Sequence, residues 1–227
     1  QGMDQVPEVA RRFGLRVALG LWLGVDSAWN ETQIENGLAL VRANGDVIDR
    51  VFVGNETLLR REMTPEALMA YLRKVRAGIP DPRIEVTTGE TWDTWLSHPQ
   101  LAEACDVVAV HLLPYWDSVA AAEGVDEVEE RLGAVRAAFP GKKIVIGETG
   151  WPSRGEPRGA AVPSQDGQAR FVQTFLARAA ARGYDYYLLE AFDQPWKSSA
   201  EGDVGGAWGL FGPEGQWKFD LPGGVSV

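Results

Sequence analysis

Short runs of branched apolar residues alternate with longer polar and apolar stretches along most of the chain. Six runs are bounded by Gly, Pro or Asn and predict strands, at 16–24, 47–54, 84–88, 107–113, 144–148 and 186–192. Runs of Val and Ile this continuous are typical of strands that are covered on both faces. The alternation of strand and helix patterns therefore predicts an α/β fold with a parallel sheet, and disfavours a sandwich or a helical bundle.

Apolar residues recur every three or four positions between these runs, which predicts helices. We expect Asn30 to cap one helix and Gly45 to end it, while Thr64 and Pro65 open another that ends at Gly78. Further helices are predicted at 5–14, around 95–104, over 128–139 and around 171–176. The Gly-rich tail from Gly205 to Val227 is predicted to be loop.

Length and charge limit the possible functions. The chain has 227 residues and a hydrophobic fraction of 45%, which suits a single domain over 1–227, and no apolar run is long enough to cross a membrane. The formal net charge is −10, which disfavours nucleic acids and anionic membranes as partners. A neutral ligand fits this charge better.

Several common catalytic devices are absent from the sequence. The only two histidines, His98 and His111, lack the spacing of a metal site, so we expect no metal. There is no Gly-x-Ser-x-Gly elbow, and the single cysteine, Cys105, precedes a predicted strand, so a nucleophilic triad is disfavoured. Cys105 is expected to pack as a small apolar residue.

Polar and aromatic residues gather where the predicted strands end. In (β/α) barrels, catalytic groups come from the carboxyl ends of several strands. The residues at these ends are Trp22, Asn55, Glu56, Glu90, His111, Tyr115, Trp116, Glu148, Trp151, Glu190 and Trp196. A doubly wound sheet would more often show a Gly-rich phosphate turn after its first strand, and none is present.

Two of these residues, Glu56 and Glu148, suggest the paired carboxylates of glycoside cleavage. The chain has nine tryptophans, and those near strand ends could stack on the apolar faces of sugar rings. Each tryptophan alone could equally be a core residue, and Glu148 could instead form a structural ion pair with an arginine. The clustering of aromatic and acidic residues at strand ends favours a sugar site.

Three sequence blocks resemble glycoside hydrolase family 17, the β-1,3-glucanases and β-1,3-glucanosyltransferases. They are Val53–Glu56, Gly147–Ser153, and Glu190–Lys197 with Trp208–Phe211, and the last block is especially similar to bacterial members. The blocks occur in the family's order, and the resemblance extends over essentially the whole chain.

The resemblance implies a (β/α)8 TIM barrel that acts with retention of configuration and needs no cofactor. It implies that Glu56 is the acid/base, that Asn55 binds the sugar 2-hydroxyl, and that Glu148 is the nucleophile. The other expected substrate-binding residues are Trp22, Glu90, His111, Tyr115, Trp116, Trp151, Glu190, Gln194 and Lys197. Gln194 departs from the glutamate common in plant members, which leaves the role of that position open.

Counted against this family, the strand predicted at 16–24 is the third strand of the barrel. Strands 1 and 2 have no counterpart in the sequence, so we expect an N-terminally incomplete barrel that is open or is completed by another piece. For retention, the two carboxyl groups are expected about 5–5.5 Å apart.

The resemblance implies activity on a β-1,3-glucan oligosaccharide or polysaccharide through a covalent glucosyl-enzyme, as an endo-hydrolase or as a glucanosyltransferase. A non-catalytic β-glucan-binding domain with an incomplete barrel is the alternative. Family members imply a periplasmic or extracellular location, sometimes with fusion to a membrane segment, although no signal peptide is visible in the sequence.

Overall fold

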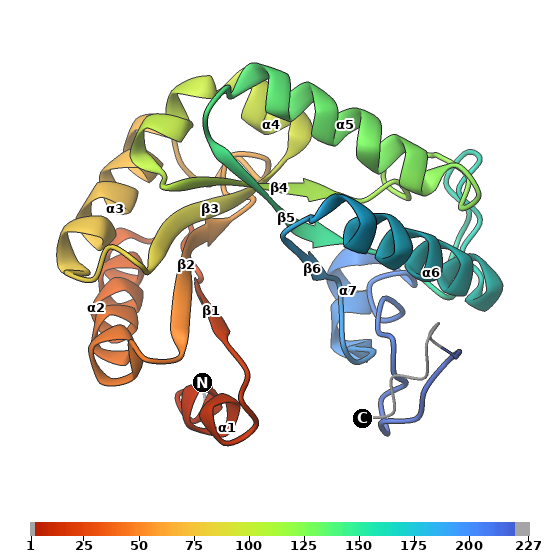
Figure 1. The fold of residues 1–227 in the computed structure, drawn as a ribbon, viewed down its shortest axis with the longest axis horizontal. Helices are drawn as coiled ribbons and strands as arrows, with labels where there is room; N and C mark the ends of the chain where they lie inside the picture. The colour runs from red at the N-terminus through yellow and green to blue at the C-terminus, as the bar shows by residue number, and fades with distance from the viewer. Residues whose placement is uncertain (1–2, 221–227) are drawn as a thin grey trace. The chain divides into compact units, whose positions relative to one another are not determined.

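A computed structural model describes residues 3–220, and its strands follow one another in sequence order. The strands are β1 (Val17–Leu21), β2 (Ile48–Asn55), β3 (Glu85–Thr91), β4 (Val107–Leu112), β5 (Lys143–Thr149) and β6 (Tyr186–Leu188). They form a six-stranded sheet in the order β1-β2-β3-β4-β5-β6 (Figure 1). The pairs β1–β2, β2–β3 and β5–β6 are parallel. This arrangement confirms the predicted α/β fold with six strands of the barrel pattern.

Helices separate the strands as the sequence predicted. They are α1 (Val6–Arg12), α2 (Ser27–Asn44), α3 (Pro65–Gly78), α4 (Trp92–Ser97), α5 (Gly124–Ala138), α6 (Gln165–Arg182) and α7 (Ser198–Glu201), with 3-10 turns η1 (Pro99–Ala104) and η2 (Pro195–Lys197). Among the described residues, no helix combines the length and apolar character needed to cross a membrane.

The chain divides into two compact units. The first runs to Val110 and includes Val135–Ile144, and the second comprises His111–Ala134 and the chain from Val145 onward. The expectation of one catalytic domain over 1–227 stays a prediction.

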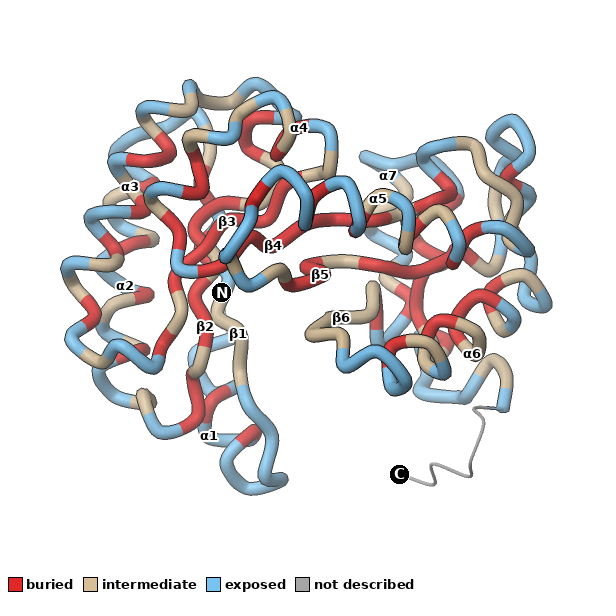
Figure 2. The backbone as a smooth tube through the Cα atoms, turned by 45° about the horizontal axis from the view of Figure 1, so that its top comes forward, coloured by how far each residue is buried: buried red, intermediate tan, exposed pale blue. Residues whose placement is uncertain are grey.

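In the first unit, α2 and α3 lie along β1–β3 and bury their apolar stripes (Figure 1). Ile34 and Val41 of α2 and Leu68 and Leu72 of α3 are almost fully buried. Buried residues also run along β2 and β3 (Figure 2). Burial of these side chains stabilises the unit by roughly 1.5–3 kcal/mol each.

The start of α3 agrees with its sequence signal, whereas the start of α2 does not. Thr64 accepts the Ala67 N–H through its hydroxyl, and Pro65 occupies the first helical position. The predicted cap of α2 is wrong, because Asp26 is the residue whose carboxylate accepts the first free N–H groups. Asn30 lies inside α2 and is buried.

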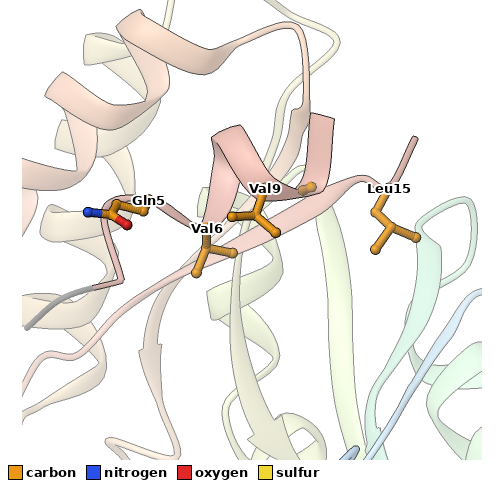
Figure 3. A pocket seen from close by; sticks show the side chains of 5 residues that line it. Gln5, Val6, Val9 and Leu15 are labelled. Atoms are coloured by element: carbon orange, nitrogen blue, oxygen red, sulfur yellow. The ribbon is translucent and has the colours of Figure 1, made fainter. Parts of the chain in front are cut away.

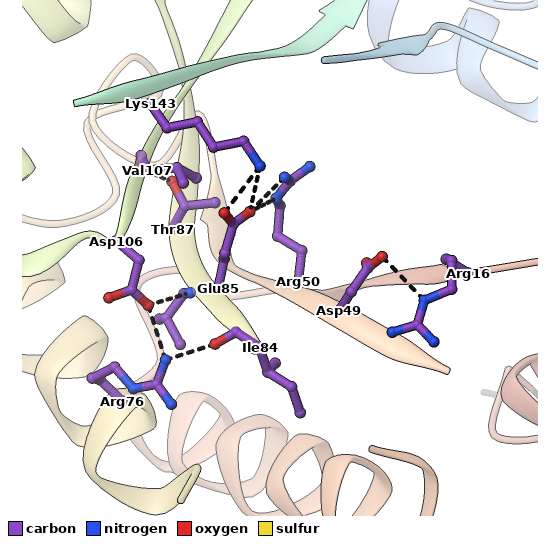
Figure 4. A network of polar contacts seen from close by, with 11 residues as sticks. Arg16, Asp49, Arg50, Arg76, Ile84, Glu85, Thr87, Asp106, Val107 and Lys143 are labelled. Carbon is purple, nitrogen blue, oxygen red and sulfur yellow. Dashed lines mark hydrogen bonds and ion pairs between the residues drawn. The ribbon is translucent and has the colours of Figure 1, made fainter. Parts of the chain in front are cut away.

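A charged cluster lies near the amino ends of the strands in the first unit (Figure 4). The Glu85 carboxylate accepts hydrogen bonds from Arg50 Nε at 3.0 Å and from Lys143 Nζ at 3.0 Å. Asp106 accepts from Arg76 Nη1 at 2.9 Å and from the Val86 N–H at 2.7 Å. The Arg50 side chain is only 7% exposed, so its charge requires this pairing.

An apolar pocket of about 350 Å3 lies at the amino-terminal side of β1. Val6, Val9 and Leu15 contribute apolar side chains to it, together with Gln5 and Ala10 (Figure 3). Leu15 precedes the amino end of β1, whereas the candidate site residue Trp22 follows its carboxyl end. Within the first unit, the pocket is therefore separate from the candidate site.

In the second unit, α6 supplies an aromatic core. Phe171 and Phe175 are fully buried and stack with ring centroids 6.2 Å apart, and Phe175 meets Tyr186 of β6 edge to face. The hydroxyl of Ser164 caps α6 by accepting the Gly167 N–H, and Gly183 ends the helix in the left-handed conformation. The helix predicted around 171–176 is confirmed and extends over Gln165–Arg182.

The last predicted strand, 186–192, is too long, because β6 ends at Leu188. The Leu189 N–H still donates to Thr149 O of β5, and from Glu190 onward the backbone exchanges hydrogen bonds with the segment 208–211. Glu190 N–H donates to Trp208 O, and Leu210 N–H donates back to Glu190 O. From 205 to 220 the chain forms only isolated bridges, as predicted for a loop, whereas 221–227 lies outside the described residues.

Candidate active site

The turn after β2 presents Glu56 in an uncommon backbone conformation. Glu56 has φ 53° and Gly54 has φ 77°, so two of three successive residues lie in the left-handed region. The Glu56 N–H donates to Gly89 O at 2.7 Å, which ties the turn to β3. A non-glycine residue held in this region is strained, and such strain is concentrated at functional sites. The turn places Asn55 and Glu56 together at the carboxyl end of β2.

Glu90 is fully buried and organises the segment that follows Glu56. Its Oε1 accepts from the Leu58 N–H at 2.9 Å and from the Thr57 hydroxyl at 3.3 Å. Oε2 accepts from the Leu59 N–H at 3.4 Å. The structure therefore gives Glu90 a supporting position beneath the Glu56 turn, and direct substrate binding by Glu90 stays a prediction.

Trp22 lies at the end of β1 with 58% of its surface exposed. The guanidinium of Arg60 lies 4.7 Å from the centroid of its ring. The loop after Trp22 is held by Asn30, whose side chain bonds both the N–H and the carbonyl of Gly24. Trp22 thus offers an aromatic face in the first unit, as a sugar platform requires.

In the second unit, Glu148 of β5 lies beside His111 of β4. Nδ1 of His111 and Oε2 of Glu148 are 3.7 Å apart. The His111 side chain is 1% exposed, whereas that of Glu148 is 25% exposed. Glu148 therefore keeps access to a ligand while a buried imidazole lies against its carboxylate.

An aromatic cluster in the second unit includes Trp151, which follows Glu148 closely in the sequence. Tyr115 contacts Trp116, Trp151 and Trp208 edge to face, with ring centroids 4.9, 6.4 and 5.9 Å away. The Tyr115 hydroxyl donates to Glu156 O at 3.0 Å, and burial raises the pKa of this hydroxyl. Tyr115 therefore acts first as a support for the neighbouring rings.

The two tryptophans of this cluster differ in access. Trp116 is 36% exposed, and Arg158 lies 5.7 Å from its ring centroid while bonding its carbonyl. Trp151 is fully buried and packs against Phe171. A ring without an exposed face cannot stack on a sugar, so the prediction of Trp151 as a stacking residue is corrected to a packing role.

Glu190, Gln194 and Lys197 meet at a polar cluster after β6. Oε2 of Glu190 accepts from Lys197 Nζ at 2.6 Å and from the Gln194 amide. Oε1 of Glu190 is buried and has no hydrogen-bond partner among the described residues. Lys197 Nζ lies 5.9 Å from the centroid of the exposed Trp196 ring. The structure therefore brings into contact three residues that the sequence placed in one block.

Three polar residues that support this region were missed from the sequence. Gln168 of α6 donates to the carbonyls of Trp151, Trp208 and Gly209. Asp193 is ion-paired with Lys218, and burial lowers the pKa of Lys218. A glutamine in a helix and a lysine in a Gly-rich tail carry no local signal for such roles.

Comparison with known proteins identifies the family. The model of the BtgE/BtgC glycoside hydrolase domain matches residues 1–209. The chain belongs to this family. A crystal structure of a glycoside hydrolase family 17 β-1,3-glucanosyltransferase from Rhizomucor miehei is 26% identical with a TM-score of 0.84, covering 94% of this chain and 78% of that one. An active-site mutant of the Rhizomucor miehei enzyme in complex with laminaritriose has a TM-score of 0.85 at 25% identity, covering 95% and 80%.

Curated relatives of this family 17 chain have names that indicate the same family as the two crystal structures. A glucan 1,3-beta-glucosidase of Arthroderma benhamiae is 27% identical, over 93% of this chain and 73% of the relative. The probable family 17 glucosidase SCW4 of Saccharomyces cerevisiae is 30% identical over 93% of this chain, which spans only 55% of SCW4. These comparisons confirm the family inferred from the three sequence blocks. The similarity to bacterial members stays a prediction, because the relatives named here are fungal.

Proposed function

We propose that this chain is a retaining glycosidase that acts on β-1,3-glucan, with Glu148 as nucleophile and Glu56 as acid/base. The observation that carries the proposal is the position of two carboxylates, each directly at the carboxyl end of a strand. Glu148 is the penultimate residue of β5 and lies beside the buried His111, and Glu56 follows β2 in a strained turn. Glycoside hydrolysis with retention needs such a pair.

The first chemical step forms a covalent glucosyl-enzyme. A Glu148 carboxylate oxygen attacks the anomeric carbon of a β-linked glucosyl unit, and the glycosidic bond breaks. Its electron pair passes to the leaving oxygen, which takes a proton from the Glu56 carboxyl group. Glu56 is then ionised, and the glucosyl unit is held on Glu148 with inverted configuration.

The second step releases the glucosyl unit with a second inversion. Glu56 removes a proton from the acceptor hydroxyl while the acceptor oxygen attacks the anomeric carbon and Glu148 leaves as a carboxylate. Water as acceptor gives hydrolysis, and a second glucan gives transfer. Both outcomes use the same two residues, so product length distinguishes them.

The neighbouring groups have supporting roles in this proposal. His111 Nδ1, 3.7 Å from Glu148 Oε2, orients the nucleophile. Asn55, next to Glu56, binds the sugar 2-hydroxyl. The Glu190, Gln194 and Lys197 cluster offers acceptors and donors for other hydroxyls, and the exposed rings of Trp22 and Trp116 offer stacking faces.

The substrate class is supported by the named relatives, which include a glucan 1,3-beta-glucosidase and a β-1,3-glucanosyltransferase. The net charge of −10 also fits an uncharged polysaccharide. We place the enzyme outside the cytoplasm, where such polysaccharides occur. The chain spans 55% of SCW4 and 37% of an Aspergillus fumigatus btgE. The proposal therefore concerns the activity of this chain and not the activities of those longer proteins.

Product analysis on a β-1,3-linked gluco-oligosaccharide tests the proposal. We expect shorter products for hydrolysis or longer ones for transfer, and complete loss of both in Glu148→Gln, because an amide cannot act as the nucleophile. Glu129→Gln, in α5 of the same unit, is the matched control and should retain turnover. Conversion by Glu148→Gln at the wild-type rate would show that another residue is the nucleophile.

The same experiment addresses a non-catalytic glucan-binding domain. Under that alternative, wild-type protein would bind the oligosaccharide and leave its length unchanged. Isothermal calorimetry with the recovered oligosaccharide measures the binding. Binding without conversion by the wild-type chain would reject the enzymatic proposal in favour of the binding domain.

A further inference from the structure

Lys218 makes an unusual set of contacts for a lysine in an irregular segment. Its ammonium donates to Asp193 Oδ1 at 2.6 Å, to the Ser153 hydroxyl at 2.8 Å and to Ala207 O at 3.3 Å. The side chains of Lys218 and Asp193 are only 11% and 6% exposed. All three donor positions of the ammonium are therefore used, inside the second unit.

The three acceptors come from three different segments. Ser153 lies in the loop that follows Glu148, Asp193 lies between Glu190 and Gln194, and Ala207 lies in the segment that pairs with both. The Ser153 N–H also donates to Ala207 O at 2.9 Å. One charged group thus joins the loop after β5 to the loop after β6.

The Asp193 side of this contact reaches the polar cluster directly. Asp193 Oδ1 also accepts the Gly209 N–H at 3.0 Å, and the Asp193 N–H donates to Phe211 O at 2.9 Å. These bonds fix the backbone next to Gln194, whose amide bonds Glu190. Any movement of Asp193 therefore moves the cluster that faces the substrate in the proposed function.

We propose that Lys218 is a positioning residue that holds the loop after Glu148 in register with the Glu190, Gln194 and Lys197 cluster, and so sets the geometry of a sugar subsite. This inference rests on the proposed function. Lys218 donates to Ser153, Asp193 and Ala207, so it acts on the site through the loops that carry them. Its effect falls on substrate binding more than on the chemical step.

When Lys218 is changed, we expect the loop after β5 to become less firmly held, without unfolding of the unit. The contacts of Gln168 are an independent reason for this expectation. Its amide, from α6, bonds the carbonyls of Trp151, Trp208 and Gly209 at 2.9, 3.1 and 3.1 Å. This neutral contact joins the same loop to the same segment. The two segments therefore stay together without Lys218, but their relative position is no longer fixed by a charge.

Lys218→Met tests the inference with Lys218→Arg as the conservative variant. We expect KM for a β-1,3-linked gluco-oligosaccharide to rise roughly tenfold in Lys218→Met with a smaller change in kcat, and to return toward the wild-type value in Lys218→Arg. Arg178→Met, which removes an ion pair with Glu129 elsewhere in the second unit, is the matched control. It should lower thermal stability without changing KM.

Hydrogen exchange supplies a readout that needs no substrate. Lys218→Met should speed exchange at the amides of Ser153 and Gly209, while amides within α6 exchange as in the wild type. Unchanged exchange at both amides, or equal KM changes in Lys218→Met and Arg178→Met, would overturn the inference. If the wild-type chain neither converts nor binds the oligosaccharide, the proposed function fails, and the exchange result alone decides whether Lys218 holds the loops.

Discussion

Glu90 shapes the backbone that follows the proposed acid/base. Its carboxylate accepts two N–H groups and one hydroxyl from residues 57–59 while it is completely buried. Carboxylates hold such donors more strongly than neutral groups do. The position of Glu56 therefore depends on a side chain that lies in the next strand.

Glu90→Gln replaces one acceptor oxygen with a donor that faces backbone N–H groups. We expect the free energy of unfolding to fall by roughly 1–3 kcal/mol, and kcat to fall because Glu56 is displaced. Urea denaturation and steady-state kinetics measure the two effects. Glu66→Gln, at an exposed position in the first turn of α3, removes the same charge and should leave both quantities nearly unchanged.

Cys105 is buried, and burial raises the pKa of its thiol to about 12. In the unfolded chain the thiol ionises near its ordinary pKa of 9.0. The folded state therefore binds more protons between these values, so the thiol's contribution to stability is present below pH 9 and is lost as pH rises toward 12.

We expect Cys105 in the native chain to react with a thiol reagent at pH 8 far more slowly than in urea-unfolded chain, because the reactive thiolate is suppressed. Absorbance of the released chromophore measures the rate, with Cys105→Ala as the unreactive control. Equal rates in native and unfolded chain would contradict the burial of this side chain.

Individual residue predictions succeeded where the signal was local. Thr64 and Pro65 mark a helix start by their own chemistry, and the structure confirms it. Asn30 has the same type of side chain as a helix cap, but it is used to hold Gly24 instead. Trp151 could be read as an exposed platform or as core, and only packing against Phe171 decides between them.

The turn at the end of β2, which carries Glu56, depends on Gly54. A Cβ at this position would lie 2.8 Å from Thr57 Cγ2, and the residue has φ 77°. Both the steric contact and the left-handed conformation exclude larger residues without strain. The geometry of this turn therefore requires a glycine at position 54.

Gly54→Ala should lower the free energy of unfolding by roughly 1–3 kcal/mol and reduce turnover, because the strained turn carries Glu56. Gly133→Ala is the matched control. Gly133 is exposed within α5 and has open space around it, so the change should raise stability by roughly 0.5–1 kcal/mol. Chemical denaturation compares both variants, and equal effects would contradict the role of the turn.

The apolar runs located all six strands, but some strand ends differ from the prediction. The strand predicted at 16–24 ends at Leu21, the strand predicted at 84–88 continues to Thr91, and the largest difference is at β6. The run 186–192 is continuous in sequence, yet its second half pairs with 208–211 instead of β5. Hydrogen bonding between segments that are about 20 residues apart is invisible to a local pattern. The Lys218 contacts are missing from the sequence analysis for the same reason, because Lys218 and Ser153 are 65 positions apart.

The family of the whole chain could be inferred from three short blocks because each contains residue types that chemistry restricts. An acid after a buried strand, followed by Gly and Trp-Pro, is rarely a packing motif, and the family comparison confirms the inference. The roles of Glu56 and Glu148 depend on how the chain acts on a substrate.

Trapping of the glucosyl-enzyme tests the central proposal most directly. The chain is incubated with an activated 2-deoxy-2-fluoro β-glucosyl donor, which slows release from the nucleophile, and is then digested for peptide mass spectrometry. We predict one added fluoroglucosyl group on the peptide that contains Glu148, and none in Glu148→Gln. A label on another residue, or turnover of the glucan with inverted product configuration and no label, would contradict the proposed mechanism.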